Sequence, residues 1–257
     1  MGKVLAEQGV RFTYIRDPSR SEAFDPCRIL EDIYADGAAI AMLPWQNGLR
    51  MAASDYVILA TARDSGRCLG VIALSDRGTE REPFLFVDAA YLAPAAPASL
   101  TLQRMLGFAV LCIAGNETVP SVIAACVQTP CYVGMLRAFG QHFTAAAVFP
   151  AQPQDVVIEL GMASLARRIV RVVRPGSRCQ SANGTFHAPS LAYASGGSSA
   201  AETLVVLDLS MANEASILED ARRLYRARPP RTPRRAAAAE MAAGKPQVAA
   251  MHGATAM

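Results

Sequence analysis

The stretch FLFVDAAYLAP, Phe84–Pro94, decides the fold predicted for this chain, because it is an apolar, aromatic-rich run interrupted by one carboxylate, Asp88. Residues of this kind favour a β-strand, and the prolines that follow end it. Two earlier β-rich runs, Tyr56–Ala62 and Cys68–Leu74, are separated by turn-forming residues 63–67, which predicts an antiparallel hairpin. We expect Phe84–Pro94 to extend that hairpin into a sheet.

A helix, a buried strand and a second helix are predicted after this run. The first helix, capped by Ser99 and ending at Gly115, is indicated by apolar residues at helical spacing: Leu102, Met105, Leu106, Ala109, Val110 and Ile113. Ser121–Val127 is continuously apolar, which is typical of a strand buried on both faces. Thr129–Pro130 then favours the start of another helix, with Gly140 as its left-handed cap.

The two flanks of this central region carry weaker signals. Before it, Val10–Ile15 predicts a strand and Asp25–Pro26 predicts a capped helix start. After it, the sequence favours strands and helices at these places: strands at Phe143–Phe149, Val156–Leu160 and Leu204–Leu209, and helices at Leu165–Arg174 and around Ile217–Tyr225. Residues 161–221 either complete the same sheet or form a separate lobe, and the sequence leaves both arrangements open.

Composition places the chain among globular proteins. It has 257 residues, of which 52% are hydrophobic, enough for a substantial core. No apolar run is long enough to cross a bilayer, and the N-terminus has no apolar signal region, so we expect a cytoplasmic protein. We predict an α+β protein with a first domain at residues 1–160, an α/β extension at 161–226 that packs on it, and a disordered tail at 227–257.

Charge is distributed unevenly along the chain. From Arg222 onward, seven arginines and Lys245 stand against a single glutamate, whereas the preceding residues carry a net charge of −4. The acidic body argues against general nucleic-acid binding, and the basic tail lacks the interleaved aromatic residues that stack on bases. Only a loosely spaced trio, Cys126, Cys131 and His142, resembles a metal site, so we expect no bound metal.

The predicted order of elements resembles the GNAT superfamily of acyl-CoA-dependent N-acyltransferases. Four segments within roughly Val10–Leu160 carry the resemblance: FLFVDAAYLAP, LTLQRMLGFAVLCIAG, SVIAACV and TPCYVGMLRAFG. It implies a mixed, mostly antiparallel sheet with helices on both faces. It also implies that the strands Phe84–Leu92 and Ser121–Val127 splay apart, so that a thioester enters between them and backbone N–H groups near Tyr91 and Leu92 hold its carbonyl oxygen.

In this family, the pyrophosphate of coenzyme A is held by a glycine-rich turn at a helix N-terminus, where free N–H groups and the helix dipole attract anions. The corresponding span here, Ala93–Thr101, contains no glycine and has Pro97 near the place of the family's first polar residue. Proline removes a donor, and β-carbons keep a phosphate at a distance, so we expect a weakened site. The candidates for this cofactor-binding site are Ala98, Ser99, Leu100 and Thr129.

Two residues are candidates for proton transfer. An ammonium nucleophile must lose a proton before it attacks a thioester, and Asp88 matches the place where family members often carry a carboxylate facing the acceptor. The alternative for Asp88 is a structural carboxylate hydrogen-bonded to a turn or to an arginine, and Glu82 is a second candidate base. Tyr132 is the candidate acid for the leaving thiolate, because the family's usual tyrosine position holds Leu136; its alternative is a core tyrosine.

Three functions remain open from the sequence. The first is an N-acyltransferase that moves the acyl group of acetyl-CoA or a longer acyl-CoA to a small-molecule or peptide amine by direct attack. The second is a GNAT-like protein without catalysis that serves as a binding or interaction module, which the glycine-free turn favours. The third is a nucleic-acid-associated protein that acts through its basic tail. The oligomeric state is not fixed by any of these patterns.

Overall fold

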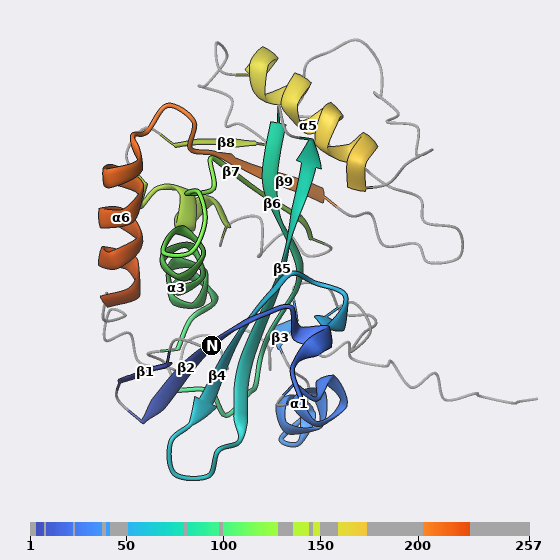
Figure 1. Cartoon of the computed structure of the whole chain (residues 1–257), viewed down its shortest axis with the longest axis vertical. Coiled ribbons are helices and arrows are strands. Elements are labelled where there is room, and N and C mark those ends of the chain that lie inside the picture. Colours follow the sequence, from blue (N-terminus) through green and yellow to red (C-terminus); the bar gives the residue numbers. More distant parts are fainter. Residues whose placement is uncertain are drawn as a thin grey trace, which may run out of the picture. The chain divides into compact units, whose positions relative to one another are not determined.

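Figure 1 shows the computed structural model, which describes these parts of the chain: residues 4–7, 9–22, 24–37, 40–41, 51–79, 82–97, 100–127, 136–143, 146–149, 159–173 and 203–226. The helices and strands, in chain order, are β1 (Val4–Glu7), β2 (Val10–Arg16), η1 (Pro18–Arg20), α1 (Pro26–Tyr34), β3 (Ile40–Ala41), β4 (Tyr56–Ala62), β5 (Cys68–Thr79), β6 (Glu82–Leu92), α3 (Leu102–Ala114), β7 (Val122–Val127), β8 (Ala147–Phe149), α5 (Glu159–Val173), β9 (Thr203–Asp208) and α6 (Glu214–Arg226). They form an α+β structure, as predicted.

The first elements form where the sequence indicates. β1 and β2 pair across Gly9, whose φ of +80° is a conformation that glycine adopts at little cost. α1 begins after Asp25, whose side chain accepts hydrogen bonds from two backbone N–H groups of the first turn. Pro26 occupies the first helical position, where no N–H is needed. The predicted strand at Val10–Ile15 and the predicted helix start are therefore confirmed.

Three long strands, β4, β5 and β6, form the centre of the sheet. β4 and β5 pair as an antiparallel hairpin around residues 63–67, where Gly66 has a φ of +70°. β6 pairs antiparallel with β5 over its whole length, from Glu82 to Leu92. These pairings confirm the predicted hairpin and its extension by the run at Phe84–Pro94. The apolar side chains of these strands are buried on both faces of the sheet.

The cap of α3 lies two residues later than predicted. Thr101 is the cap, because its hydroxyl accepts a hydrogen bond from the backbone N–H of Arg104 at 3.2 Å. The prediction of Ser99 as the cap is therefore wrong: both residues have a hydroxyl side chain, but Thr101 stands directly before the first helical residue, Leu102. The predicted apolar stripe of this helix is buried, and all six residues of β7 are buried as expected.

The second half of the chain corrects one predicted strand. Val156–Leu160 was expected to be the last strand of the central region, but Glu159 and Leu160 open α5, and residues 151–158 lie outside the described parts. A short apolar run does not distinguish a strand from the first turn of a helix. The strand that completes the sheet is β9, close to the predicted Leu204–Leu209, and α6 forms where the last helix was expected.

Gly140 has a different role from the predicted left-handed cap. Residues 136–140 are helical, and Gly140 itself belongs to that helix. A β-carbon at Gly140 would lie 2.6 Å from Val148 Cγ2 and 2.7 Å from Leu207 Cδ1. Glycine is needed there because the helix packs closely against β8 and β9, and not because the backbone requires a positive φ.

The strands form one mixed sheet in the order β1-β2-β4-β5-β6-β7-β9-β8, and β3 pairs separately with β6. β6 and β7 are parallel, whereas the other described pairs are antiparallel. Because β9 lies between β7 and β8, the predicted boundary at residue 160 does not separate two domains; Met1–Ala227 is one compact unit. The predicted disordered tail at 227–257 lies outside the described residues.

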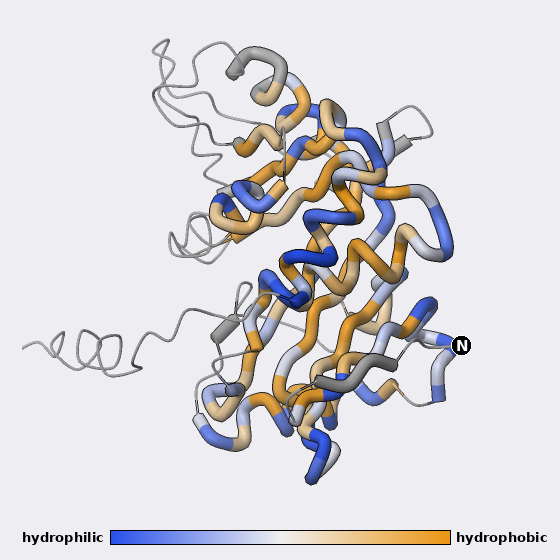
Figure 2. The backbone as a smooth tube through the Cα atoms, turned by 90° about the vertical axis from the view of Figure 1, so that its left-hand side faces the viewer, coloured by the Kyte–Doolittle hydropathy of each residue, from blue (hydrophilic) through white to orange (hydrophobic). Residues whose placement is uncertain are grey.

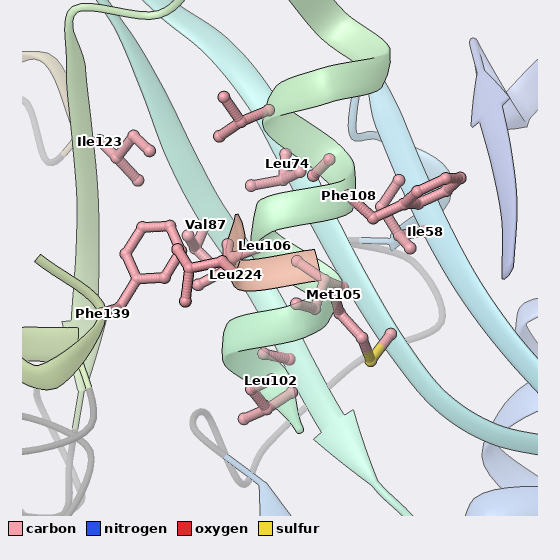
Figure 3. Close-up of a cluster of buried hydrophobic side chains, with 14 of the residues drawn as sticks. Ile58, Leu74, Val87, Leu102, Met105, Leu106, Phe108, Ile123, Phe139 and Leu224 are labelled. Carbon is pink, nitrogen blue, oxygen red and sulfur yellow. The ribbon is translucent and has the colours of Figure 1, made fainter. Parts of the chain in front are cut away.

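Helices cover both faces of this sheet. α3 and α6 lie side by side on one face, where side chains from α3 and from the strands form a single core (Figures 1 and 3). On the opposite face, α1 covers β4, β5 and the end of β6, and α5 covers β7, β9 and the start of β6. In Figure 2 long stretches of the central strands are hydrophobic orange, whereas hydrophilic blue lies at turns and also along helical segments.

Candidate active site

Asp88 lies at an irregularity in the centre of the sheet. The β5–β6 ladder pairs Leu74 with Val87 and Ala73 with Ala89, so Asp88 has no partner position on β5. A bulge of this kind bends the strand and re-aims a side chain. Val87 packs in the core beneath α3, whereas Asp88 contacts groups on the opposite face, the face of α1 and α5.

Three side chains donate hydrogen bonds to Asp88, which is only 4% exposed. Ser54 Oγ lies 3.0 Å from Oδ2, the Ser75 hydroxyl also donates to Oδ2, and Arg77 Nη2 lies 2.7 Å from Oδ1. A buried charge is tolerated when it is paired and hydrogen-bonded, and this set meets that condition. The alternative considered from the sequence, a carboxylate bonded to an arginine, is thus present, and the role of Asp88 as a base stays a prediction.

We refer to Ser54, Ser75, Arg77 and Asp88 together as the Asp88 cluster. Arg77 connects this cluster to the surface. Its side chain is 35% exposed, and its guanidinium carbon lies 5.1 Å from the centroid of the buried Phe86 ring. The three partners of Asp88 were not predicted from the sequence. Ser75 and Arg77 had a signal, because they are polar residues two apart in an apolar strand and therefore share a face. Ser54 had none, since it lies in the turn before β4.

β6 and β7 separate in the middle of the sheet. Their parallel ladder has three pairs and ends at Val87 and Ala125. β6 continues to Leu92 paired with β5, and β7 continues to Val127 paired with β9, so each strand goes on without the other. The bulged Asp88 immediately follows the last pair. This is the place where the family resemblance implies a splay.

The edge of β6 beyond this separation is taken by another part of the chain. β3 pairs antiparallel with it, with Ala41 opposite Tyr91 and Ile40 opposite Leu92. β5 occupies the other edge of β6 along its whole length, so β3 lies on the side that β7 has left. Tyr91 and Leu92, predicted to hold the thioester, are therefore buried and paired on both sides.

The turn before α3 uses one of the donors that were predicted for phosphate. The backbone N–H of Leu100 donates to the carbonyl of Pro97 at 2.8 Å, and the Leu100 side chain is buried. This N–H closes a local turn, and the expected part of Leu100 in phosphate binding stays a prediction. The remaining predicted site residues, Ala98, Ser99, Thr129 and Tyr132, lie outside the described residues. Glu82, the second candidate base, opens β6 at the end remote from Tyr91.

Arg104, on the first turn of α3, is a buried cation that sequence analysis did not identify. It is 7% exposed, its Nε donates to the carbonyl of Tyr225 at 3.0 Å, and its guanidinium carbon lies 5.7 Å from the rings of both Phe12 and Tyr225. The signal was a charged residue inside an apolar helix. Arg104 joins the start of α3 to the end of α6, so it serves the packing of the two helices.

A second polar group lies at the margin of the α3 face. The Tyr56 hydroxyl donates to Glu117, which also pairs with Arg16 at 2.8 Å. Burial raises the pKa of Tyr14 to about 12 and, with the help of the Glu117 hydrogen bond, raises the pKa of Tyr56 further. Both phenols stay neutral near pH 7, so neither supplies a phenolate there.

A pocket beside the start of β6 does not include any residue of the Asp88 cluster in its lining. It has a volume of about 250 Å³ and lies between α5 and the start of β6, with these residues in its lining: Gly78, Phe84, Ser121, Arg168, Ile169 and Asp208. Phe84 belongs to the opposite end of β6 from Tyr91 and Leu92. The pocket therefore does not mark the predicted thioester position.

Neither membrane nor metal features occur in the parts of the chain that the structure describes. No helix there is both long and apolar enough to cross a bilayer. The same parts contain no grouping of His, Cys, Asp and Glu side chains that could bind a metal ion. Of the loosely spaced trio noted in the sequence, Cys126 is buried and His142 is exposed, while Cys131 lies outside the described residues. Comparison of the chain with protein-family models and with curated proteins finds no match, so its function is inferred from the chemistry of the site.

Proposed function

We propose that this protein is an acyl-CoA-dependent N-acyltransferase of the GNAT type, which transfers an acyl group from a coenzyme A thioester to an amine. The observation that carries the proposal is the separation of β6 and β7 after Val87 and Ala125. The family resemblance implies a splay between these two strands, and a sheet hydrogen-bonded along their whole length would have excluded it. The strand order, with one parallel pair in its middle, supports the same proposal.

The chemistry of the proposed reaction assigns a task to the Asp88 cluster. The amine nitrogen attacks the thioester carbonyl carbon, a C–N bond forms, the C–S bond breaks and the sulfur leaves as a thiolate. The proton that the amine loses passes to Asp88, directly or through water. Asp88 directly follows the last β6–β7 pair, which places this carboxylate next to the separation of the two strands.

A second candidate function is a GNAT-like binding or interaction module without catalysis. Two observations favour it: β3 pairs with the edge of β6 at Tyr91 and Leu92, and the Leu100 N–H is engaged by Pro97. Both groups were expected to contact acyl-CoA. Acyl-CoA binding of the GNAT kind therefore requires the two-residue β3 ladder to open, and a module that binds no thioester does not.

Calorimetric titration with acetyl-CoA and with longer acyl-CoAs separates the two candidates. The transferase proposal predicts binding of at least one of these thioesters at millimolar concentration or below, and release of free thiol when an amine acceptor is added. Absence of binding by every thioester at millimolar concentration would contradict the transferase and leave the module.

The variant Asp88→Asn tests the proposed base. It should lower turnover by a factor of about one hundred or more, as loss of a general base commonly does, while thioester binding persists. Asp64→Asn is the matched control, because Asp64 is an exposed aspartate in the β4–β5 turn. Unchanged turnover in Asp88→Asn would assign the base to another residue.

A further inference from the structure

The guanidinium of Arg77 is held in place on one side and accessible on another. Nη2 is hydrogen-bonded to the buried Asp88, and the plane is supported by Phe86. A guanidinium carries five N–H donors, and no other hydrogen bond from Arg77 occurs within the described residues. The Arg77 side chain is 35% exposed, so it is the member of the ion pair that solvent and ligands can reach, whereas Asp88 is 4% exposed.

This arrangement differs from that of an ordinary surface ion pair. Surface pairs hold two long, mobile side chains together and contribute little. Here the carboxylate is 4% exposed, sits on a strand bulge and accepts two serine hydroxyls as well, so the arginine is anchored to a rigid partner. A planar guanidinium fixed in this way suits recognition of a second carboxylate through two parallel hydrogen bonds.

The charges at the cluster also restrict which amines fit. A simple amine arrives as a cation and meets the exposed positive charge of Arg77 before it reaches the buried Asp88. An amine that also carries a carboxylate places its negative charge on Arg77 and its ammonium toward Asp88, so that two opposite pairs form side by side. Such a zwitterion is complementary in charge to the Arg77–Asp88 ion pair.

We infer that Arg77 binds a carboxylate of the acceptor, and that the acceptor is an amine bearing a carboxylate next to the nitrogen, that is, an α-amino acid. The inference rests on the proposed function, since it names the substrate class of the same site. Arg77 is then a specificity-determining residue, and Asp88 both orients it and receives the proton.

The test compares acceptors that differ only by the carboxylate. L-Phenylalanine is paired with 2-phenylethylamine and L-leucine with 3-methylbutylamine, each with acetyl-CoA or the longer thioester that binds best. The wild-type protein should favour the carboxylate-bearing member by about tenfold or more in kcat/KM, the size expected for a charge-assisted hydrogen-bond pair. Equal use of both members, or a preference for the simple amine, would overturn the inference.

Variants of Arg77 test whether this residue causes the preference for carboxylate-bearing acceptors. Arg77→Gln removes the ion-pair partner of Asp88 and should lower kcat for both acceptor classes, but it should raise KM only for the amino acids and so bring the ratio of kcat/KM values close to one. Arg77→Lys keeps the positive charge but loses the planar pair of N–H donors, and should retain part of the preference for carboxylate-bearing acceptors. Arg167→Gln on α5 is the control, because Arg167 is an exposed arginine outside the cluster. An equal loss for both acceptor classes in Arg77→Gln would mean that Arg77 is only structural.

Binding without catalysis separates failure of this inference from failure of the proposed function. If no thioester binds, L-phenylalanine and 2-phenylethylamine are titrated alone, with protein-detected chemical shifts as the readout. Binding of the amino acid that is lost in Arg77→Gln and kept in Arg167→Gln would support Arg77 as the carboxylate site while the transferase fails. No binding of either compound at millimolar concentration would overturn the inference.

Discussion

The two faces of the sheet are built differently. Beneath α3 and α6, one apolar core runs from β2 across to β9 without interruption. On the other face, two separate cores lie under α1 and under α5, and the Asp88 cluster stands where β6 passes from one to the other. Phe86 belongs to the core under α5, and Ala89 belongs to the core under α1.

The two faces therefore contribute differently: the continuous core contributes mainly to stability, and the interrupted face carries the polar groups. A continuous core adds buried apolar area along its whole length and favours one arrangement of the strands. Interrupting the other core with a carboxylate, an arginine and two hydroxyls gives up apolar burial at the centre of the sheet, and each polar atom must be hydrogen-bonded. That cost is expected at a functional site, where local rules for stability are broken for another purpose.

Truncation in the continuous core should have the largest effect on stability. Leu106, on the buried face of α3 (Figure 3), is 1% exposed, and Leu106→Ala should lower the free energy of unfolding by about 2–5 kcal/mol. Leu165→Ala, at the half-buried margin of the core under α5, should lower it by less than half as much. Urea unfolding midpoints at unchanged slope measure both. Equal losses would mean that the margin of the core under α5 contributes as much to stability as the centre of the continuous core.

Gly140→Ala adds volume to the same continuous core. Its β-carbon would overlap Val148 and Leu207, so the free energy of unfolding should fall by about 1–3 kcal/mol. The double variant with Val148→Ala removes one of the overlapping side chains and should recover part of this loss, a coupling that a double-mutant cycle measures. Strict additivity of the two changes would contradict the close packing of this helix against β8.

Ser75→Ala tests the interrupted face. It leaves Asp88 without one of its hydroxyl donors, and the free energy of unfolding should fall by about 1–2 kcal/mol. Ser65→Ala, in the exposed β4–β5 turn, is the matched control and should stay within about 0.5 kcal/mol of the wild type. If Ser75→Ala were as mild as the control, the hydroxyl would not be a necessary partner of the carboxylate.

The smallest predicted effect depends on pH and concerns the margin of the α3 face. Burial raises the pKa of Asp76, and the nearby Glu117 and Asp55 raise it further. Ionised Asp76 is therefore less favourable in the folded than in the unfolded chain. This penalty is absent below the ordinary Asp pKa of 3.8 and complete once the pH exceeds the raised folded value.

Asp76→Asn should accordingly raise Tm by about 1 °C at neutral pH and have no such effect near the acid limit of folding. Differential scanning calorimetry at several pH values measures the difference. A gain in Tm that is the same at acidic and neutral pH would show that ionisation of Asp76 is not its cause.

Much of the fold was predictable because its elements carry local signals. The β4–β5 hairpin, β6, α3 and β7 each have the expected periodicity or a continuous apolar run, and their turns contain the expected residue types. The place of β9 was not predictable, because it pairs with β7 across a long separation in the chain and the intervening residues carry weak patterns. Neither was β3, since two residues are too short to show any period.

Less of the candidate site could be predicted. Asp88 was identifiable as a carboxylate in an apolar strand, and its position after the last β6–β7 pair agrees with the splay that the resemblance implies. Its partners depend on the bulge, which shifts the register by one residue and brings Ser75, Arg77 and the distant Ser54 to the same carboxylate. Register shifts of this kind have no signal in single-strand periodicity.

β3 makes the apparent affinity smaller than the intrinsic one for a ligand that binds the same edge of β6. A compound that needs the main chain of Tyr91 and Leu92 competes with an intramolecular occupant, so its measured Kd is the intrinsic Kd divided by the fraction of molecules in which that occupant has left. Saturation curves then report detachment and association together. A substitution near Ile40 that weakens the pairing of β3 with β6 would lower the measured Kd of such a ligand without contacting the ligand.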